Sequence, residues 1–155
     1  MKSLVVYYSR TGTTKKVAQE ITKALKSDIE EVIDIKNRKG HLGYLISGRD
    51  ASMKRLTLIK PMQKDASKYD LVIIGTPVWA WDVTPAIRTY LVQTKITKKA
   101  AVFCTLGGSG SKTAFKSMKA LIKGEVVAEL SLKTKEVKNN PSDKIKEFVE
   151  KINSN

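Results

Sequence analysis

The chain has 155 residues, a formal net charge of +14 and one cysteine, Cys104, which excludes an internal disulfide. This length predicts a single domain, residues 1–155, with room for a substantial core. The sequence contains no run of 18 apolar residues and enters a strand pattern at once, so we expect a cytoplasmic protein without membrane insertion or a signal peptide.

The positive charge is spread over both halves of the chain. Residues 1–75 contain 15 Lys and Arg against 8 Asp and Glu, and residues 76–155 contain 14 against 7. Such an excess attracts acidic proteins, nucleic acid or anionic membranes. The alternative is a solvated, lysine-rich surface without a dedicated partner.

The first elements are a strand and a helix joined by a turn rich in hydroxyl groups. Residues 3–8 are β-branched and aromatic, which suits a strand buried on both faces of a parallel sheet. From Val17 to Leu25, apolar residues recur at helical spacing. Unpaired N–H groups at a helix start favour anions, so the turn is a candidate phosphate site, with an ordinary N-cap as the alternative. It reads Ser9, Arg10, Thr11, Gly12, Thr13 and Thr14.

The middle of the chain contains two further predicted strands, residues 30–35 near an edge and the buried run 70–75. Between them, residues 37–64 predict one or two irregular helical pieces. After the buried run comes a predicted loop that holds both tryptophans, and Pro85 starts a helix. The loop reads Thr76, Pro77, Val78, Trp79, Ala80, Trp81 and Asp82. Asp82 is interpreted as a cap for that helix or, less readily, as a ligand to a ring nitrogen.

The last third of the chain repeats the alternation. Residues 100–105 predict a fourth strand, in which Cys104 is a small buried hydrophobe. Residues 125–132 predict a fifth strand, and Ser142 or Asp143 caps a final helix. The fourth strand is followed by a glycine-rich loop that permits close approach to a flat group. This loop reads Leu106, Gly107, Gly108, Ser109 and Gly110.

Strands that alternate with helices predict an α/β fold with a doubly wound, five-stranded parallel sheet in three α/β/α layers. For five strands we expect the order 2-1-3-4-5. In this order the carboxyl ends of the first, third and fourth strands are neighbours, at the point where ligands bind. These ends carry the three loops described above.

Together the three loops describe a phosphorylated ligand with a flat ring, and FMN fits this description. The first loop offers phosphate ligands, the second offers aromatic faces and the third offers a glycine-rich wall. A W-x-W loop taken alone is more often part of a core or an interface. The sequence lacks G-x-x-x-x-G-K-[ST] and G-x-G-x-x-G, the motifs of two other nucleotide-binding classes.

Over nearly its whole length the chain resembles the flavodoxin family, especially short members with T-P-V-W after the third strand. The resemblance rests on residues 9–14, 75–81 and 106–110. It implies a flavodoxin-like fold in which Ser9, Thr11, Gly12, Thr13 and Thr14 hold the FMN phosphate. It also implies that residues 77–81 and 106–110 flank the ring. Arg10 and Thr76 complete the candidate cofactor-binding set, with Arg10 either a cation beside the phosphate or a solvated loop residue.

Two features depart from the familiar electron carriers of this family. Those carriers are strongly acidic, whereas this chain is strongly basic, which puts their usual positively charged partners in doubt. The segment 40–60 also differs from the plain crossover of those carriers. Resemblance to other members with Gly-Tyr-Leu in this segment suggests that it covers the flavin or shapes a partner surface.

The leading functional hypothesis is an FMN-binding flavodoxin that acts as a low-potential electron-transfer protein. The flavin does the chemistry, so no catalytic residue is needed. His41 has no metal-ligand partners at a suitable spacing, and no metal site is expected. The enzyme alternative is an FMN-dependent NAD(P)H or quinone reductase.

The basic charge favours acidic redox partner proteins, such as ferredoxin-like carriers or a flavin reductase. A third hypothesis is a nucleic-acid-binding module without flavin. Nucleic acid is not expected, because both tryptophans lie in the proposed pocket and basic and aromatic residues do not interleave along a strand.

Overall fold

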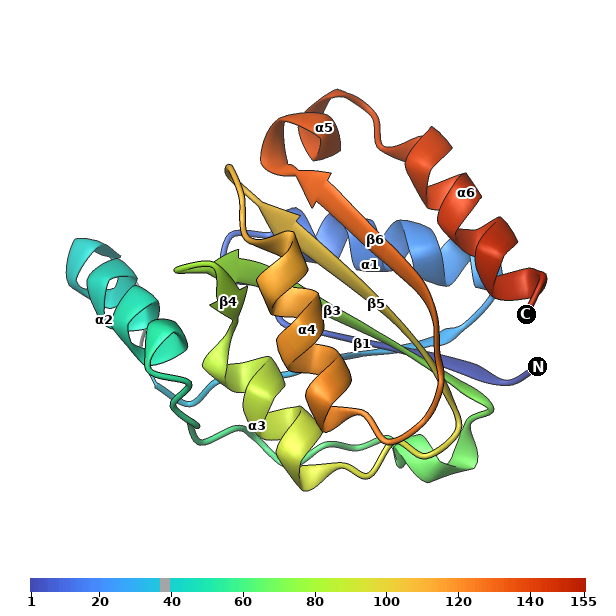
Figure 1. Ribbon diagram of the computed structural model, residues 1–155, viewed down its shortest axis with the longest axis horizontal. Helices are drawn as coiled ribbons and strands as arrows, with labels where there is room; N and C mark the ends of the chain where they lie inside the picture. The colour runs from blue at the N-terminus through green and yellow to red at the C-terminus, as the bar shows by residue number, and fades with distance from the viewer. Residues whose placement is uncertain (37–39) are drawn as a thin grey trace.

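The computed structural model describes residues 1–36 and 40–155, without the side chain of Tyr44. Helices and strands alternate along these residues, as Figure 1 shows. In chain order the elements are β1 (Ser3–Tyr7), α1 (Thr13–Leu25), β2 (Asp28–Glu31), α2 (Gly40–Ser52), the 3₁₀ turn η1 (Ala66–Lys68), β3 (Leu71–Trp79), β4 (Asp82–Val83), α3 (Pro85–Gln93), β5 (Lys99–Leu106), α4 (Ser111–Leu121), β6 (Val126–Lys133), α5 (Thr134–Asn139) and α6 (Ser142–Asn153).

The five long strands form one parallel sheet in the order β2-β1-β3-β5-β6. The predicted order 2-1-3-4-5 is therefore confirmed. The short strand β4 is an addition that pairs antiparallel with the end of β3. In the centre of the sheet, Tyr7 on β1 lies beside Gly75 on β3, and Gly75 lies beside Phe103 on β5.

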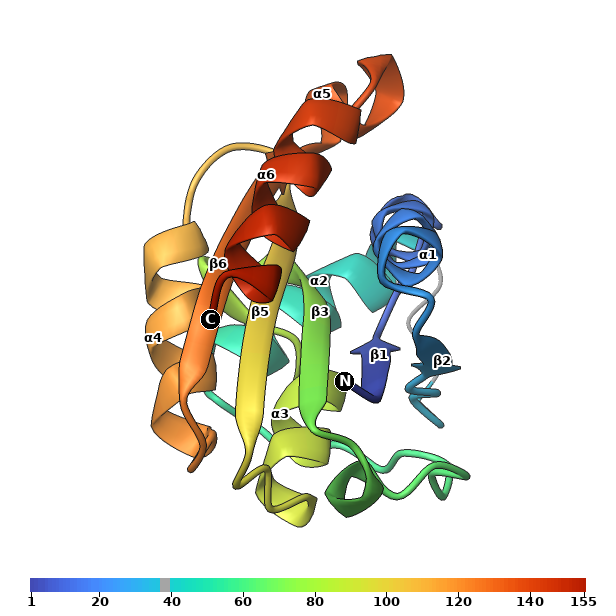
Figure 2. The same cartoon turned by 90° about the vertical axis from the view of Figure 1, so that its right-hand side faces the viewer.

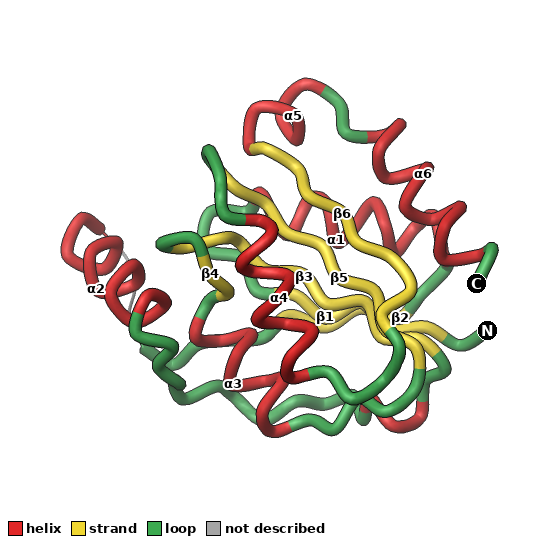
Figure 3. Tube along the Cα trace, in the orientation of Figure 1, coloured by secondary structure: helices red, strands yellow, loops and turns green. Residues whose placement is uncertain are grey.

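Helices cover both faces of the sheet, so the predicted three-layer arrangement is also confirmed. Figure 2 shows α1 and α6 on one side of the strands and α3 and α4 on the other, and Figure 3 shows the strands between them. Successive strand residues enter opposite cores, because side chains alternate along a strand. Ile73 packs in the core beneath α1 and α6, and Ile74 packs in the core beneath α3 and α4.

Several elements differ from the sequence-based expectations. The second strand was expected at residues 30–35, but β2 ends at Glu31, because the chain then turns to pair with residues 58–60. Ile35 N–H donates to Leu58 O at 2.9 Å, and Lys60 N–H donates to Ile33 O at 2.9 Å. The irregular segment contains one regular helix, α2, and residues 37–39 lie outside the described residues.

The other differences concern the second half of the chain. The helix α5 was not anticipated. The predicted cap Ser142 is the first residue of α6, which Pro141 precedes at the N-cap position.

No helix in residues 1–36 and 40–155 is long and apolar enough to cross a bilayer.

The predicted loop 76–82 is a hairpin rather than a loop. β3 continues to Trp79, and the chain returns as β4 after the two residues Ala80 and Trp81. These two residues have φ of +46° and +63°, as a two-residue turn of the favoured hand requires. Asn and Gly adopt this conformation more readily than Ala or Trp, so the turn is strained.

A buried ion pair joins this hairpin to α3. Asp82 Oδ2 lies 3.0 Å from Arg88 Nη2, and both side chains are almost fully buried. The Arg88 Nη2 and Nε groups have no hydrogen-bond partner among the described residues, so the pair is close but not well aligned. Asp82 Oδ1 accepts a hydrogen bond from Val83 N–H at 2.7 Å. The N-cap residue of α3 is Thr84, so the interpretation of Asp82 as the cap is wrong.

Removal of Asp82 leaves the Arg88 charge buried without compensation. We expect Asp82→Ala to lower the free energy of unfolding by about 3–5 kcal/mol. The double variant Asp82→Ala/Arg88→Met removes the orphaned charge and should recover much of this loss. Urea unfolding measures both. As a control, Glu129→Ala breaks the exposed pair with Lys119 and should change stability by less than about 1 kcal/mol. Similar losses in the single and double variants would contradict the interpretation.

Gly75 leaves room for the Phe103 ring on the neighbouring strand. A Cβ at Gly75 would lie 2.0 Å from Phe103 Cζ. We expect Gly75→Ala to cost about 1–3 kcal/mol of stability through overpacking. Gly48→Ala is the matched control, because a Cβ there meets nothing within 4 Å and the residue lies in α2. Thermal and urea unfolding should show a loss for the first variant and none for the second, and equal effects would refute this account.

Candidate functional site

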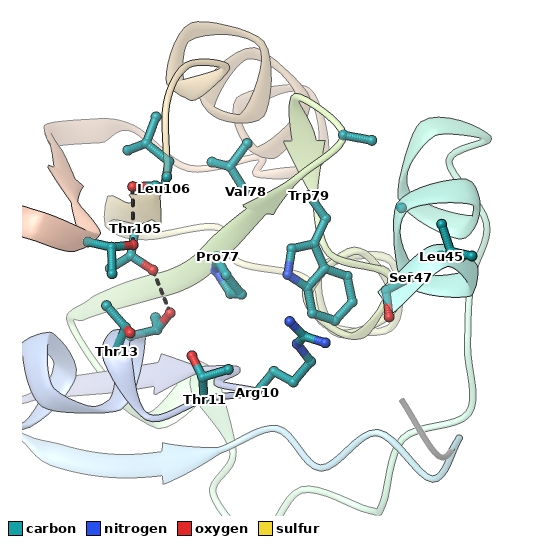
Figure 4. A pocket seen from close by; sticks show the side chains of 15 residues that line it. Arg10, Thr11, Thr13, Leu45, Ser47, Pro77, Val78, Trp79, Thr105 and Leu106 are labelled. Atoms are coloured by element: carbon teal, nitrogen blue, oxygen red, sulfur yellow. Dashed lines mark hydrogen bonds between the residues drawn. The ribbon is translucent and has the colours of Figure 1, made fainter. Parts of the chain in front are cut away.

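A pocket of about 440 Å³ lies at the carboxyl ends of β1, β3 and β5. Figure 4 shows it between the turn after β1, the end of β3, the end of β5 and the helix α2. All three predicted loops contribute to its wall, as parallel pairing of these strands requires. The lining residues are Arg10, Thr11, Thr13, Thr14, Leu45, Ser47, Gly48, Pro77, Val78, Trp79, Ala80, Thr105, Leu106, Gly107 and Thr134.

The turn after β1 presents the uncapped start of α1. Gly12 is the N-cap residue at φ +93°, and its N–H donates to Ser9 Oγ at 3.1 Å. No described side chain caps α1, and its first turn holds no acidic residue. The turn therefore does not form an ordinary N-cap with a Ser or Thr side chain. The first-turn N–H groups carry the positive end of the helix dipole, which favours an anion.

Thr14 fastens this turn to the end of β5. Its side chain is buried, and Thr14 Oγ1 lies 2.7 Å from Thr105 Oγ1. Thr134 Oγ1 donates to Leu106 O at 3.3 Å and so ties α5 to the same strand end. Thr105 and Thr134 line the pocket but were missed from sequence. Thr105 was read as part of a buried strand, and Thr134 lies in the helix that was not anticipated.

Trp79 forms an aromatic wall of the pocket. Its indole meets the Tyr8 ring edge to face, with ring centroids 5.5 Å apart. On the pocket side the Arg10 guanidinium carbon lies 5.8 Å from the centroid of the Trp79 ring. This distance suits a cation–π contact, so Arg10 lies in the pocket wall and bridges the turn after β1 to the aromatic wall.

The helix α2 supplies a further side of the pocket, within the segment 40–60 that the resemblance implied would cover the flavin or shape a partner surface, although its lining residues were not named beforehand. Figure 4 shows Leu45 and Ser47 beside Trp79, and Gly48 also lines the pocket. Ser47 is buried, and its Oγ donates to Gly43 O at 2.6 Å. The one signal in the sequence was the Gly-Tyr-Leu stretch at residues 43–45. Hydrophobicity gave none, because Leu42 and Leu45, three residues apart on one face of the helix, are both exposed.

Several predicted site residues do not line the pocket. Ser9 and Gly12 hydrogen-bond to each other within the turn after β1 and are not among the lining residues. Thr76 is fully buried, and Thr76 Oγ1 lies 3.1 Å from Thr84 Oγ1 inside the hairpin. Trp81, Gly108, Ser109 and Gly110 line a separate hollow. Trp81 is 65% exposed, so the pocket has one tryptophan wall and not two.

The pocket contains almost no ionisable chemistry. Among the described residues that line it, Arg10 alone carries a charge. Cys104 lies next to Thr105 but is completely buried, and burial raises the pKa of its thiol to about 12. No cluster of His, Cys, Asp and Glu suited to a metal ion occurs in the described part of the chain. Among the described lining residues, hydroxyl groups and Arg10 can bind and orient a ligand, and none carries a carboxylate, an imidazole or a thiol.

Similar folds occur among solved structures of flavoproteins. A flavoprotein from Lactobacillus acidophilus, solved in complex with FMN, is 24% identical, with a TM-score of 0.76 over 96% of this chain and 98% of that chain. For a flavoprotein from Bacteroides uniformis the identity is 22% and the TM-score 0.77, over 96% and 97% of the two chains. Flavodoxin 2 from Bacillus cereus is 18% identical, with a TM-score of 0.60 over 99% of each chain. At these identities the likeness establishes the fold alone.

Family membership rests on a comparison of sequence. No curated protein matches the chain. The flavodoxin family model matches residues 2–152, which is nearly the whole sequence. This match agrees with the strand order and with the pocket at the carboxyl ends of β1, β3 and β5. The chain therefore belongs to the flavodoxin family.

Proposed function

We propose that the pocket binds FMN and that the protein carries electrons at low potential between redox partners. The observation that carries this proposal is the composition of the pocket wall. It combines an uncapped helix start, hydroxyl groups, one indole face and a single cation, Arg10. These groups suit a phosphorylated ligand with a flat aromatic ring.

The phosphate would lie against the turn after β1. Thr11 and Thr13 supply hydroxyl donors, and the first-turn N–H groups of α1 supply backbone donors. Hydrogen bonds to a charged group are stronger than those to a neutral one. Arg10 lies in the same wall and adds positive charge. Thr14 keeps the turn in place through its contact with Thr105.

The ring would lie between Trp79 and the end of β5. Trp79 offers a flat apolar face, and its position is fixed by Tyr8 behind it. Nothing lies within 4 Å of the place where a Cβ would stand on Gly107, so a flat group can approach the backbone there. Leu45 on α2 adds apolar surface that keeps water away. Bound FMN would supply one- and two-electron chemistry, and this chain would bind and orient it.

The lack of proton-transferring groups favours a carrier over a turnover enzyme. No carboxylate, imidazole or thiol occurs among the described lining residues. An electron carrier needs none, because the protein tunes its cofactor through packing, hydrogen bonds and charge. A reductase for a bound organic substrate more often needs a positioned acid or base.

The hydroxyl groups of the turn provide the first test of FMN binding. We expect the double variant Thr11→Val/Thr13→Val to raise the FMN dissociation constant by about tenfold or more, since each change removes a donor to a charged group. Quenching of flavin fluorescence during titration of the apoprotein measures this constant. Thr113→Val, an exposed change in α4 outside the pocket, is the control and should bind FMN like the unaltered chain. An unchanged constant in the double variant would remove the turn from the phosphate site.

Reduction kinetics test the carrier function itself. We expect the FMN-loaded protein to be bleached slowly by NADH or NADPH alone under anaerobic conditions. Addition of an NADPH-dependent flavodoxin reductase should make bleaching much faster. Absorbance in the visible flavin bands follows the reaction. Rapid bleaching by NADH or NADPH alone, with turnover when a quinone is added, would instead support the FMN-dependent reductase alternative. A colourless protein that FMN cannot reconstitute would overturn both.

A further inference from the structure

A second hollow, of about 740 Å³, lies next to the pocket, and Leu106 lines both. Four lysines surround it: Lys112 on α4, Lys133 at the end of β6, Lys135 on α5 and Lys144 on α6. Figure 1 shows the β3–β4 turn, the β5–α4 loop and α5 at the same end of the sheet. The fold thus gathers positive charge from four separate elements beside the proposed cofactor site. We call this surface the lysine hollow.

The charge of the lysine hollow is only partly neutralised. Glu136 is the one carboxylate among the described residues that line the hollow. It accepts hydrogen bonds from Lys144 Nζ at 2.6 Å and from Lys133 N–H at 2.6 Å. These contacts, with Lys144 first, hold the pKa of Glu136 below its usual value, so the group is ionised and already engaged. Among the described residues, no acidic side chain forms an ion pair with Lys112 or Lys135. The hollow therefore keeps a net positive charge.

Trp81 stands exposed at the rim of the lysine hollow and is held in place. Its Nε1–H donates to Ser109 Oγ at 3.1 Å, and the strained turn at Ala80 and Trp81 fixes its backbone. A Cβ on Gly110 would lie 2.7 Å from Trp81 Cα, so the turn also packs closely on the β5–α4 loop. An exposed indole that is already immobilised loses little conformational entropy on binding. Tryptophan is also enriched among the residues that contribute most to protein interfaces.

We propose that the lysine hollow and Trp81 form the docking surface for an acidic redox protein. Carboxylates of the partner would pair with Lys112, Lys133 and Lys135, and an apolar side chain would pack on Trp81. This inference rests on the proposed function, because the partner would deliver or accept electrons across the Leu106 wall. Opposite charges on the two surfaces accelerate encounter, and salt weakens the effect.

The test removes the same charge from two places. The first variant, Lys112→Gln/Lys133→Gln/Lys135→Gln, alters the hollow. The matched control, Lys68→Gln/Lys95→Gln/Lys123→Gln, alters exposed lysines that precede β3, β5 and β6, at the opposite edge of the sheet. The probe is a reduced, acidic [2Fe–2S] ferredoxin mixed with the FMN-loaded protein in a stopped-flow instrument. The second-order rate constant is measured from low to high salt.

We expect the hollow variant to slow the reaction by about tenfold or more at low salt and the control by about twofold or less, with the difference vanishing at high salt. Trp81→Ala should slow the reaction at low and high salt alike. Equal losses in the two triple variants would show a general effect of net charge and overturn the docking surface. The docking surface would also be overturned if the hollow variant reacted with ferredoxin at an unchanged rate but was reduced by NADPH with a raised KM. That result would make the hollow a dinucleotide site.

Failure of docking and failure of the proposed function give different results. The FMN dissociation constant of each variant is measured first. It should be unchanged, because neither lysine set lines the cofactor pocket. If the unaltered chain binds no FMN, the proposed function fails. Calorimetric titration with the same ferredoxin then still tests docking. Calorimetric binding that both triple variants weaken equally, or that neither weakens, overturns the docking surface whatever the FMN content.

Discussion

Hydrogen bonding between β3 and its two parallel neighbours, β1 and β5, sets the position of every loop in the pocket. The register places Tyr7, Gly75 and Phe103 side by side, so all three strands end at the same edge. Gly75 makes this spacing possible, because the Phe103 ring fills the space that a side chain would need. The contact between Thr14 and Thr105 then joins the first and last of the three loops. The pocket between α1 and Trp79 follows from these contacts.

The fold and much of the pocket could be predicted because buried parallel strands read as uninterrupted apolar runs. The loops after three such runs hold Thr11, Thr13, Trp79 and Leu106, which the structure brings together in one wall. The remainder depends on tertiary contacts that leave no local pattern. Leu45 reaches the pocket from a helix face on which Leu42 and Leu45 are both exposed, so hydrophobicity alone does not mark it as a pocket residue. Trp81 turns outward because β3 continues past the expected strand end and forms a hairpin.

The pocket and the lysine hollow lie at the same end of the molecule but differ in charge. The pocket is lined by hydroxyls, apolar side chains and one arginine, whereas the hollow collects four lysines. Leu106 separates the two surfaces. Charges outside a pocket influence it through solvent and are screened by salt beyond about 8–10 Å, whereas Arg10 stands in the pocket wall itself. Changes in ionic strength therefore affect the two surfaces to different degrees.

The burial of Cys104 has a practical consequence for the protein in air. Thiols react with oxygen-derived species and with disulfides as thiolates, and a thiol with a pKa of about 12 holds almost no thiolate at neutral pH. Its sulfur is also out of reach of a second molecule, because the residue is completely buried in the centre of the sheet. With no other cysteine in the chain, covalent dimers through a disulfide cannot form while the fold is intact. Disulfide-linked dimers of this chain would therefore report prior unfolding.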